Sequence, residues 1–344
     1  MSLPDSASAY REAVLSFVWR QWGQMGVSAA VVRPDPWIQD PEALLLFSLE
    51  VARREPRIFD EILDWLAENG PTLMRQRLTQ LSRRDPDGPA AVLRASLDWA
   101  TDGGPRSRPP APRPSDEPLF VGPHTGLAAL GEPAPAFLRH GLVRPPLIRS
   151  GKSTRPDLAS PFNLAFRLRA IFGASSRAEA LRFLLAREGA PASTAEVAMA
   201  AALSRYGVHL ALEELATSGV IHKHARSPKA LRWWVDDERW RAWLSLDETG
   251  VACWVDWPHV YRGLALLWRW LNADARMEES AYIHSSRARA LMEQLRPLLV
   301  DRGLAWEPAE PARHRGEAYG EVFAQDVRRL AEALENGAAA QARA

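Results

Sequence analysis

Residues 175–235 decide the fold, and they read SSRAEALRFLLAREG (175–189), APASTAEVAMAAALSRYGVHLALEELATSGVI (190–221) and HKHARSPKALRWWV (222–235). The first part predicts a helix, because Leu181, Leu184 and Leu185 recur at i, i+3 and i+4 and so share one face. Gly189 and Pro191 then end this helix.

Two further helices are expected before residue 220. Ser193 and Glu196 have the spacing of a capping box, which predicts a short helix starting at 193 or 194. A third helix begins between Ser204 and Gly207 and ends at Gly219. Its apolar stripe follows at i, i+4 and i+7: Val208, Leu212 and Leu215.

A β-hairpin is expected after the third helix. Apolar and aromatic residues at 220–224 and 231–235 predict two strands, and the turn between them contains Pro228 and basic residues. The order is therefore helix, helix, helix and hairpin.

This order resembles the winged helix-turn-helix of bacterial transcription regulators of the MarR-like and ArsR-like groups. The residues that carry the resemblance are STAEVAMAAALSRYGVHLALEELATSGVI and HKHARSPKALRWWV. The resemblance implies that the third helix enters the major groove of double-stranded DNA while the hairpin follows the phosphates. The DNA contacts it implies are Ser204, Arg205, Tyr206 and His209 on the helix, and Lys223, Arg226, Lys229 and Arg232 on the hairpin.

Local charge favours DNA, although the chain as a whole has a formal net charge of only +1. Residues 222–232 contain four Lys/Arg and no acid, and residues 139–187 contain ten Lys/Arg and two acids. Glu213 and Glu214 on the third helix argue the other way. Winged domains also bind proteins, so the alternative function is a non-enzymatic adaptor or an antitoxin-like protein.

The whole chain is expected to be mainly α. We expect a helical domain at 1–100, a Pro-rich and partly disordered linker at 101–160, the winged domain at 161–246 and a C-terminal helical region at 247–344. Twelve of the 27 prolines lie in the linker range. Asp40–Pro41 predicts a helix start, as do Pro56 and Pro71, and the helix at 236–246 is expected to bury Trp240 and Trp243.

No motif in the sequence indicates an enzyme or a cofactor. Residues 150–154 read SGKST, but a phosphate-binding loop needs glycine where Pro146 stands, so we exclude ATP binding. His222 and His224 share a strand face without a third metal ligand nearby. Cys253, the one cysteine, is expected to be a small buried residue.

The start of the sequence has no basic and apolar leader, and no run is long enough to cross a membrane. We therefore expect a cytoplasmic protein that does not enter membranes. The resemblance also implies a homodimer, and the N-terminal helical domain is a possible site for a protein partner.

Overall fold

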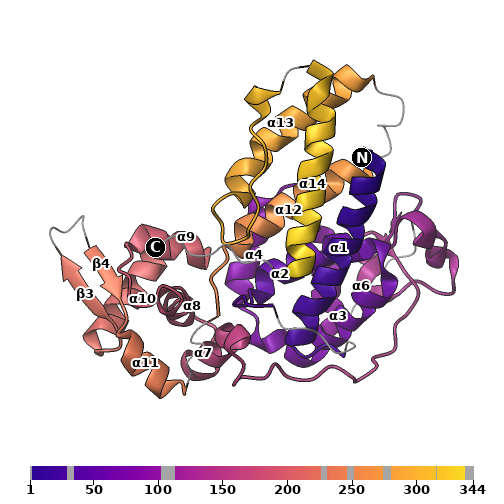
Figure 1. Ribbon diagram of the computed structural model, residues 1–344. Coiled ribbons are helices and arrows are strands. Elements are labelled where there is room, and N and C mark those ends of the chain that lie inside the picture. The colour runs from indigo at the N-terminus through magenta and orange to yellow at the C-terminus, as the bar shows by residue number, and fades with distance from the viewer. Residues whose placement is uncertain are drawn as a thin grey trace. The chain divides into compact units, whose positions relative to one another are not determined.

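The computed structural model describes residues 2–28, 35–101, 113–225, 231–245, 252–273, 280–314 and 316–337. These residues are mainly helical, with two small two-stranded sheets, which confirms the expected fold class (Figure 1). The chain forms two compact units: Met1–Gln21 together with Val255–Ala344, and Trp22–Trp254. This division does not follow the four consecutive ranges expected from the sequence, because the N-terminal helix groups with the C-terminal residues.

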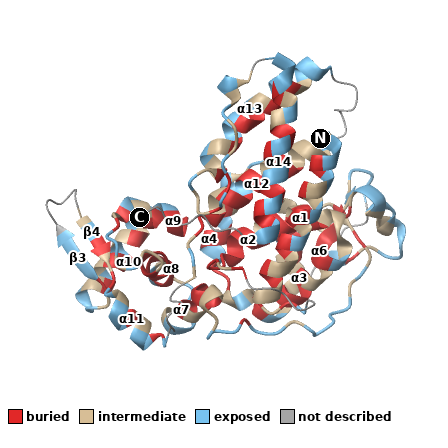
Figure 2. Ribbon diagram, viewed as in Figure 1, coloured by how far each residue is buried: buried red, intermediate tan, exposed pale blue. Residues whose placement is uncertain are grey.

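The first unit consists of packed helices with narrow apolar stripes. It contains most of α1 (Leu3–Gln24), α12 (Trp257–Asn272), α13 (Ala281–Leu299) and α14 (Tyr319–Asn336), with short 3-10 turns at Pro311–Arg313 and Gly316–Ala318. Helix α13 packs against both α12 and α14. Each helix buries residues at helical spacing, for example Leu264 and Leu267 on α12 and Leu291 and Leu295 on α13 (Figure 2).

The second unit begins with helices that have clear start signals. Helix α2 (Pro41–Val51) has Pro41 in its first turn, and the Asp40 carboxylate accepts a hydrogen bond from the backbone N–H of Ala43 at 3.1 Å. Helices α3 (Pro56–Asn69), α4 (Arg75–Arg84) and α5 (Ala90–Ala100) follow. Pro71 does not open α4 as expected: it belongs to a 3-10 turn, and extended backbone at Leu73 delays the helix to Arg75.

The Pro-rich range is folded against the helices from residue 113 onward. Short parallel strands β1 (Glu117–Pro118) and β2 (Leu142–Val143) pair, and a 3-10 stretch (Gly122–Ala129) and α6 (Pro135–Leu138) lie between them. Arg144 anchors the end of this segment: its guanidinium is buried among three phenylalanine rings and lies 2.9 Å from the Asp60 carboxylate. The segment is therefore not a linker detached from the core.

The remainder of the second unit contains the elements on which the sequence analysis concentrated. Helices α7 (Leu164–Phe172), α8 (Ser176–Leu185), α9 (Thr194–Ala201) and α10 (Arg205–Thr217) precede strands β3 (His222–Ala225) and β4 (Leu231–Trp234) and helix α11 (Asp237–Trp243). Helix α8 packs against α7, α9 and α10, and the strands pair antiparallel. The expected capping box of Ser193 and Glu196 is present at the start of α9.

Two side chains were placed wrongly by the sequence. Cys253 is exposed, because its backbone pairs with Pro36 and Ile38 and leaves the thiol at the surface. Trp243 is 56% exposed, although Trp240 is buried as expected. Helix α11 has only seven residues, so it buries one tryptophan and leaves the other, at the last turn, outside.

Candidate nucleic-acid interface

The turn between α9 and α10 sets the direction of α10. Ala202 has left-handed backbone angles (φ 53, ψ 41), Leu203 is buried, and the Ser204 hydroxyl accepts a hydrogen bond from the backbone N–H of Gly207 at 3.2 Å. The Ser204 side chain thus caps the helix, which uses one acceptor site of the hydroxyl.

Helix α10 buries one side and exposes its N-terminal turn. Val208, Leu212 and Leu215 are buried as predicted. Arg205 and Tyr206 lie at the surface, with Tyr206 74% exposed. His209 is half-buried, and its ring centroid lies 6.2 Å from that of Trp233. Arg205 and Tyr206 are therefore the predicted helix residues most accessible to a partner.

The hairpin is held in place beside the helices by one tryptophan. The backbone N–H and carbonyl of Trp233 both pair with Ala192, at 2.9 Å each, and its indole N–H donates to the Thr194 hydroxyl at 2.9 Å. Trp233 is fully buried. Because Ala192 lies between α8 and α9, these bonds fix the position of the hairpin relative to α10 (Figure 1).

The outer face of the hairpin is polar and aromatic. The register places His222 opposite Trp234 and His224 opposite Arg232, so these four side chains share one face. The rings of His222 and Trp234 stack with centroids 5.5 Å apart. Arg226 and Lys229, which the sequence also proposed as phosphate contacts, lie outside the described residues.

Several of the basic side chains at this surface have acidic neighbours. Lys223 Nζ lies 2.7 Å from Glu213 of α10, and Arg232 lies 3.8 Å from Glu196. A third pair joins Arg177 to Glu214 at 3.2 Å. Such exposed pairs are each worth about 0–1 kcal/mol, so a competing anion can separate them at small cost.

The second unit also contains a buried ion cluster that was not predicted from the sequence. We define the buried ion cluster as Asp40, Glu42, Arg77, Arg169, Glu179 and Arg182, whose side chains are at most 3% exposed. The carboxylates and guanidiniums balance three against three. The cluster connects the region of α2 and α4 with helices α7 and α8.

The geometry of the cluster leaves each arginine with at least two acidic partners. Arg77 lies 2.5 Å from Asp40 and 2.9 Å from Glu42. Arg169 lies 2.7 Å from Glu42 and 2.6 Å from Glu179. Arg182 lies 2.9 Å from Glu179 and 3.3 Å from Asp40. Every charge therefore has the paired environment that burial requires.

The arginines of the cluster lower the pKa of two of its carboxylates. Burial by itself raises the pKa of Glu179, but Arg169, Arg182 and Arg77 outweigh it and lower that pKa to about 2. The same balance, with Arg77 and Arg182 prevailing over burial, lowers the pKa of Asp40. Both carboxylates are therefore ionised at neutral pH.

This cluster corrects the charge count made from the sequence. Arg144, Arg169 and Arg182 are three of the ten basic residues between 139 and 187, and all three are buried and paired. They add nothing to a surface that attracts phosphate. Only the spacing of Glu179 and Arg182, i and i+3 on a helix, was a sequence sign of this pairing.

The SGKST segment does not form a phosphate cradle. The Asp64 carboxylate accepts hydrogen bonds from the backbone N–H groups of Ser150, Gly151 and Ser153 at 2.8, 3.1 and 3.3 Å. Burial raises the pKa of Asp64, but these bonds prevail and lower it. A carboxylate of the chain thus occupies the donors that a phosphate would need.

The described residues show neither a metal site nor a membrane-spanning helix. Within the described ranges, no group of three or more His, Cys, Asp or Glu side chains could hold a metal ion, and no helix is long and apolar enough to span a bilayer. Comparison of the chain with protein-family models, curated proteins and solved structures gives no match.

Proposed function

We propose that the protein is a DNA-binding transcriptional regulator in which α8, α9, α10 and the β3–β4 hairpin form a winged helix-turn-helix. The observation that carries this proposal is the exposed first turn of α10, with Arg205 and Tyr206, next to a hairpin that Trp233 and Ala192 hold in place. Helix α10 is the reading element and the hairpin is the wing.

The dimensions of an α-helix suit this role. A helix with its side chains is about 10–12 Å across, and the major groove of B-DNA is about 12 Å wide. The guanidinium of Arg205 can donate two hydrogen bonds to the O6 and N7 atoms of guanine. In this proposal Tyr206 and His209 contact a neighbouring base or phosphate.

The hairpin supplies contacts that do not depend on base sequence. Lys223 exchanges Glu213 for a DNA phosphate, and Arg232 exchanges Glu196 in the same way. Each phosphate contact releases counterions from DNA, which favours binding and makes it weaken with salt. Arg226 and Lys229 extend this role in the proposal.

The proposal includes a homodimer in the cytoplasm that needs no cofactor and catalyses no reaction. A dimer would place two copies of α10 on half-sites about one helical turn of DNA apart, roughly 34–36 Å. The helical region before residue 101 remains a possible contact for a protein partner.

A second candidate function is that of an adaptor that binds a protein through the same face. The observation that favours it is a set of exposed apolar side chains: Met199 is 50% exposed, Tyr206 74% and Leu210 45%. Tyr206 and Leu210 are four residues apart on α10 and so share a side of the helix. Aromatic and methionine side chains are enriched at the centres of protein interfaces.

A gel-shift experiment decides between the two functions. The full chain is mixed with its own upstream DNA and with scrambled DNA of equal length at about 150 mM salt. We expect preferential retention of the native fragment, and a log–log salt slope that becomes less steep by about one unit in Lys223→Ala, because one phosphate contact is lost.

Arg239→Ala serves as the control for lost positive charge, since Arg239 is exposed on α11 and belongs to neither α10 nor the hairpin. Equal binding of native and scrambled DNA would contradict sequence-specific regulation. Absence of retention at micromolar protein would favour the adaptor, and affinity capture with a Tyr206→Ala, Leu210→Ala control would follow.

A further inference from the structure

A hollow of about 300 Å³ lies beside α13 in the first unit. Three of its lining residues belong to α13 and three to the segment before α14: Tyr282, Ser286, Arg289, Ala312, His314 and Gly316. We infer that this hollow binds a small molecule through an oxyanion, either a phosphate or a carboxylate. The inference is independent of the proposed DNA binding, since none of these residues belongs to the candidate interface.

The walls of the hollow are held together on both sides. At one side the Arg289 guanidinium donates a hydrogen bond to the carbonyl of Pro311. At the other side the Ser285 hydroxyl donates to the carbonyl of Glu317 at 2.9 Å and accepts from the backbone N–H of Gly320 at 3.1 Å. The segment is thus tied to α13 before and after the residues that line the hollow.

The polar side chains that line the hollow are all hydrogen-bond donors. Tyr282, Ser286 and Arg289 recur at i, i+4 and i+7 and so project from one face of α13. His314 contributes a ring N–H from the opposite wall. Among the described residues that line the hollow, none is a carboxylate. A wall with donors and a cation, and without an acid, recognises the oxygens of an anion.

Arg289 is the positive charge of the hollow, and it is held in a fixed orientation. Its guanidinium lies 4.7 Å from the centroid of the Tyr319 ring and is also bonded to Pro311. Among the described residues, no acidic side chain lies within ion-pair distance of Arg289. The remaining guanidinium N–H groups are therefore positioned for an anion without first leaving a carboxylate.

A buried acid on α14 already has hydrogen-bond partners. The oxygens of Asp326 accept hydrogen bonds from the backbone N–H of Ala309, at 3.1 Å from one oxygen, and from the guanidinium of Arg329. Neither partner is among the residues that line the hollow, so Asp326 is satisfied by groups outside it.

The volume limits the size of the ligand. At about 30 Å³ per water-sized group, the hollow accepts roughly ten non-hydrogen atoms. This is at the lower end of the range for small-molecule sites. The ring of Tyr282 and the methyl group of Ala312 offer apolar contacts to the part of the ligand that carries no charge.

Isothermal titration calorimetry on the full chain tests the inference. The probes are inorganic phosphate, phenyl phosphate and benzoate, each titrated at the same ionic strength. We expect saturable binding of one molecule per chain for at least one probe, and the comparison of the phosphates with benzoate identifies the anion. Arg289→Gln should weaken that binding about tenfold to a hundredfold, as loss of a charged hydrogen bond does.

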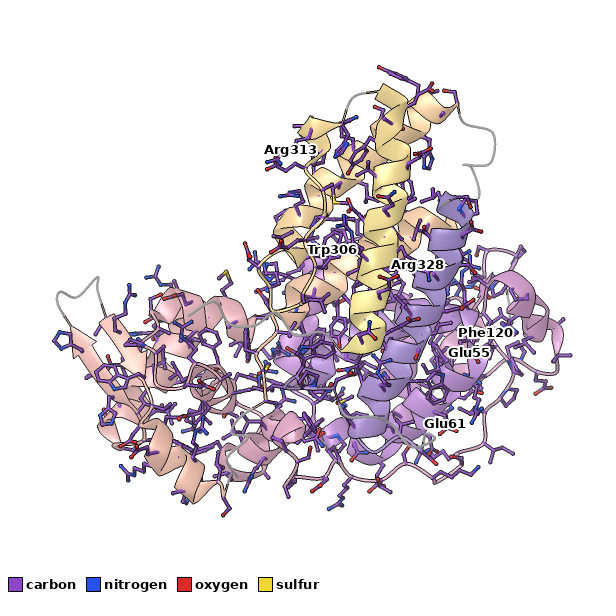
Figure 3. All side chains as sticks on the ribbon, viewed as in Figure 1. Glu55, Glu61, Phe120, Trp306, Arg313 and Arg328 are labelled. Carbon is purple, nitrogen blue, oxygen red and sulfur yellow. The ribbon has the colours of Figure 1, made fainter. Side chains whose placement is uncertain are left out.

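Arg313→Gln is the matched control. Arg313 lies in the same segment (labelled in Figure 3), is 77% exposed, and pairs with Glu310 at 2.8 Å without lining the hollow. The affinity of the Arg313→Gln protein for the probe should stay within about twofold of the wild-type value. This substitution removes only a long-range attraction, which salt screens. Equal weakening by Arg313→Gln and Arg289→Gln would overturn the inference, as would no saturable binding of any probe.

A second pair of variants keeps the test valid if Arg289→Gln does not fold. Ser286→Ala and His314→Ala remove one donor each from opposite walls and leave the bond to Pro311 in place. Each should weaken the bound probe about threefold to tenfold with an unchanged melting temperature. Unchanged affinity in both variants would also overturn the inference.

Discussion

Arginine has opposite roles in two regions of the second unit, the buried ion cluster and the exposed face of α10 and the hairpin. In the cluster, Arg77, Arg169 and Arg182 are nearly inaccessible and each has at least two carboxylate partners. At the surface, Arg205 and Arg232 are exposed, and Arg232 has a single distant partner, Glu196. The same side chain organises the interior in one region and lies exposed to solvent in the other.

The comparison shows why a count of basic residues is a poor guide to a nucleic-acid site. A buried arginine is tolerated only with carboxylates around it, so its field is cancelled locally. A surface arginine has a weak partner or none, so its field extends to about the Debye length, roughly 8–10 Å. The following four predictions test this difference, from the largest expected effect to the smallest.

The largest effect is expected from removal of one partner in the buried ion cluster. Arg77→Met leaves buried Asp40 with Arg182 alone and buried Glu42 with Arg169 alone, so the cluster carries an uncompensated negative charge, and the free energy of unfolding should fall by about 3–5 kcal/mol. Urea unfolding followed by circular dichroism measures the loss. Arg177→Met, which breaks an exposed pair with Glu214, is the control and should cost less than about 1 kcal/mol. An equal loss of stability in Arg77→Met and Arg177→Met would contradict the expected difference between buried and exposed arginines.

The second prediction concerns the loss of folding stability at acidic pH. Because the pKa of Glu179 is lowered from 4.5 to about 2, its ionised form stabilises the fold above pH 4.5, and this contribution is lost as the pH falls toward 2. At about 1.36 kcal/mol per pKa unit, the loss amounts to roughly 3 kcal/mol. Urea midpoints at pH 7, 4.5 and 2.5 measure it.

Glu179→Gln provides the reference for this titration. Its stability at pH 7 should be lower than that of the wild type, and it should change less between pH 4.5 and 2.5, because the titrating carboxyl group is absent. An identical pH dependence in the two proteins would mean that Glu179 does not titrate as its environment indicates.

The third prediction concerns the surface. Arg205→Ala should weaken binding to the native upstream DNA by about 1–3 kcal/mol and reduce discrimination at one base pair. The free energy of unfolding should change by less than about 0.5 kcal/mol, because Arg205 is exposed. Fluorescence anisotropy measures the affinity, with Arg239→Ala as control. A loss of affinity that is equal for all DNA sequences would assign Arg205 to phosphate instead of base contacts.

The smallest effect is expected from Glu213→Gln. This change frees Lys223 from its pair at 2.7 Å and removes a negative charge from α10. Affinity for DNA of any sequence should rise by a few tenths of a kcal/mol to about 1 kcal/mol, with little change in stability. Anisotropy at low and moderate salt detects the gain. Unchanged or weaker binding would show that Lys223 does not face the DNA.

Local sequence signals predicted the secondary structure well where they had a short-range cause. Each of these signals lies within about two turns of one helix: the capping box of Ser193 and Glu196, the stripe of Val208, Leu212 and Leu215, and the proline starts of α2 and α3. The two strands of the hairpin likewise depend on adjacent residues. The mainly α class follows from these signals alone.

Positions that depend on distant residues were not predictable in this way. The partners of Arg169 lie on α2 and α8, and those of Arg182 include Asp40, which is 142 residues away. The grouping of α1 with the C-terminal helices and the packing of Arg144 among phenylalanines have the same origin. The hollow beside α13 also requires residues 282–289 and 312–316 to meet.

The sequence by itself therefore determined the mainly helical class, the starts of α2, α3 and α9 at prolines and caps, and the buried stripe of α10. Only the tertiary structure decided which charged side chains are exposed at the surface, because burial and pairing are set by side chains far apart in the chain. Arg205 and Arg182 look alike in the sequence. Arg205 lies in the exposed first turn of a helix, whereas Arg182 lies beneath Trp254 and between two carboxylates.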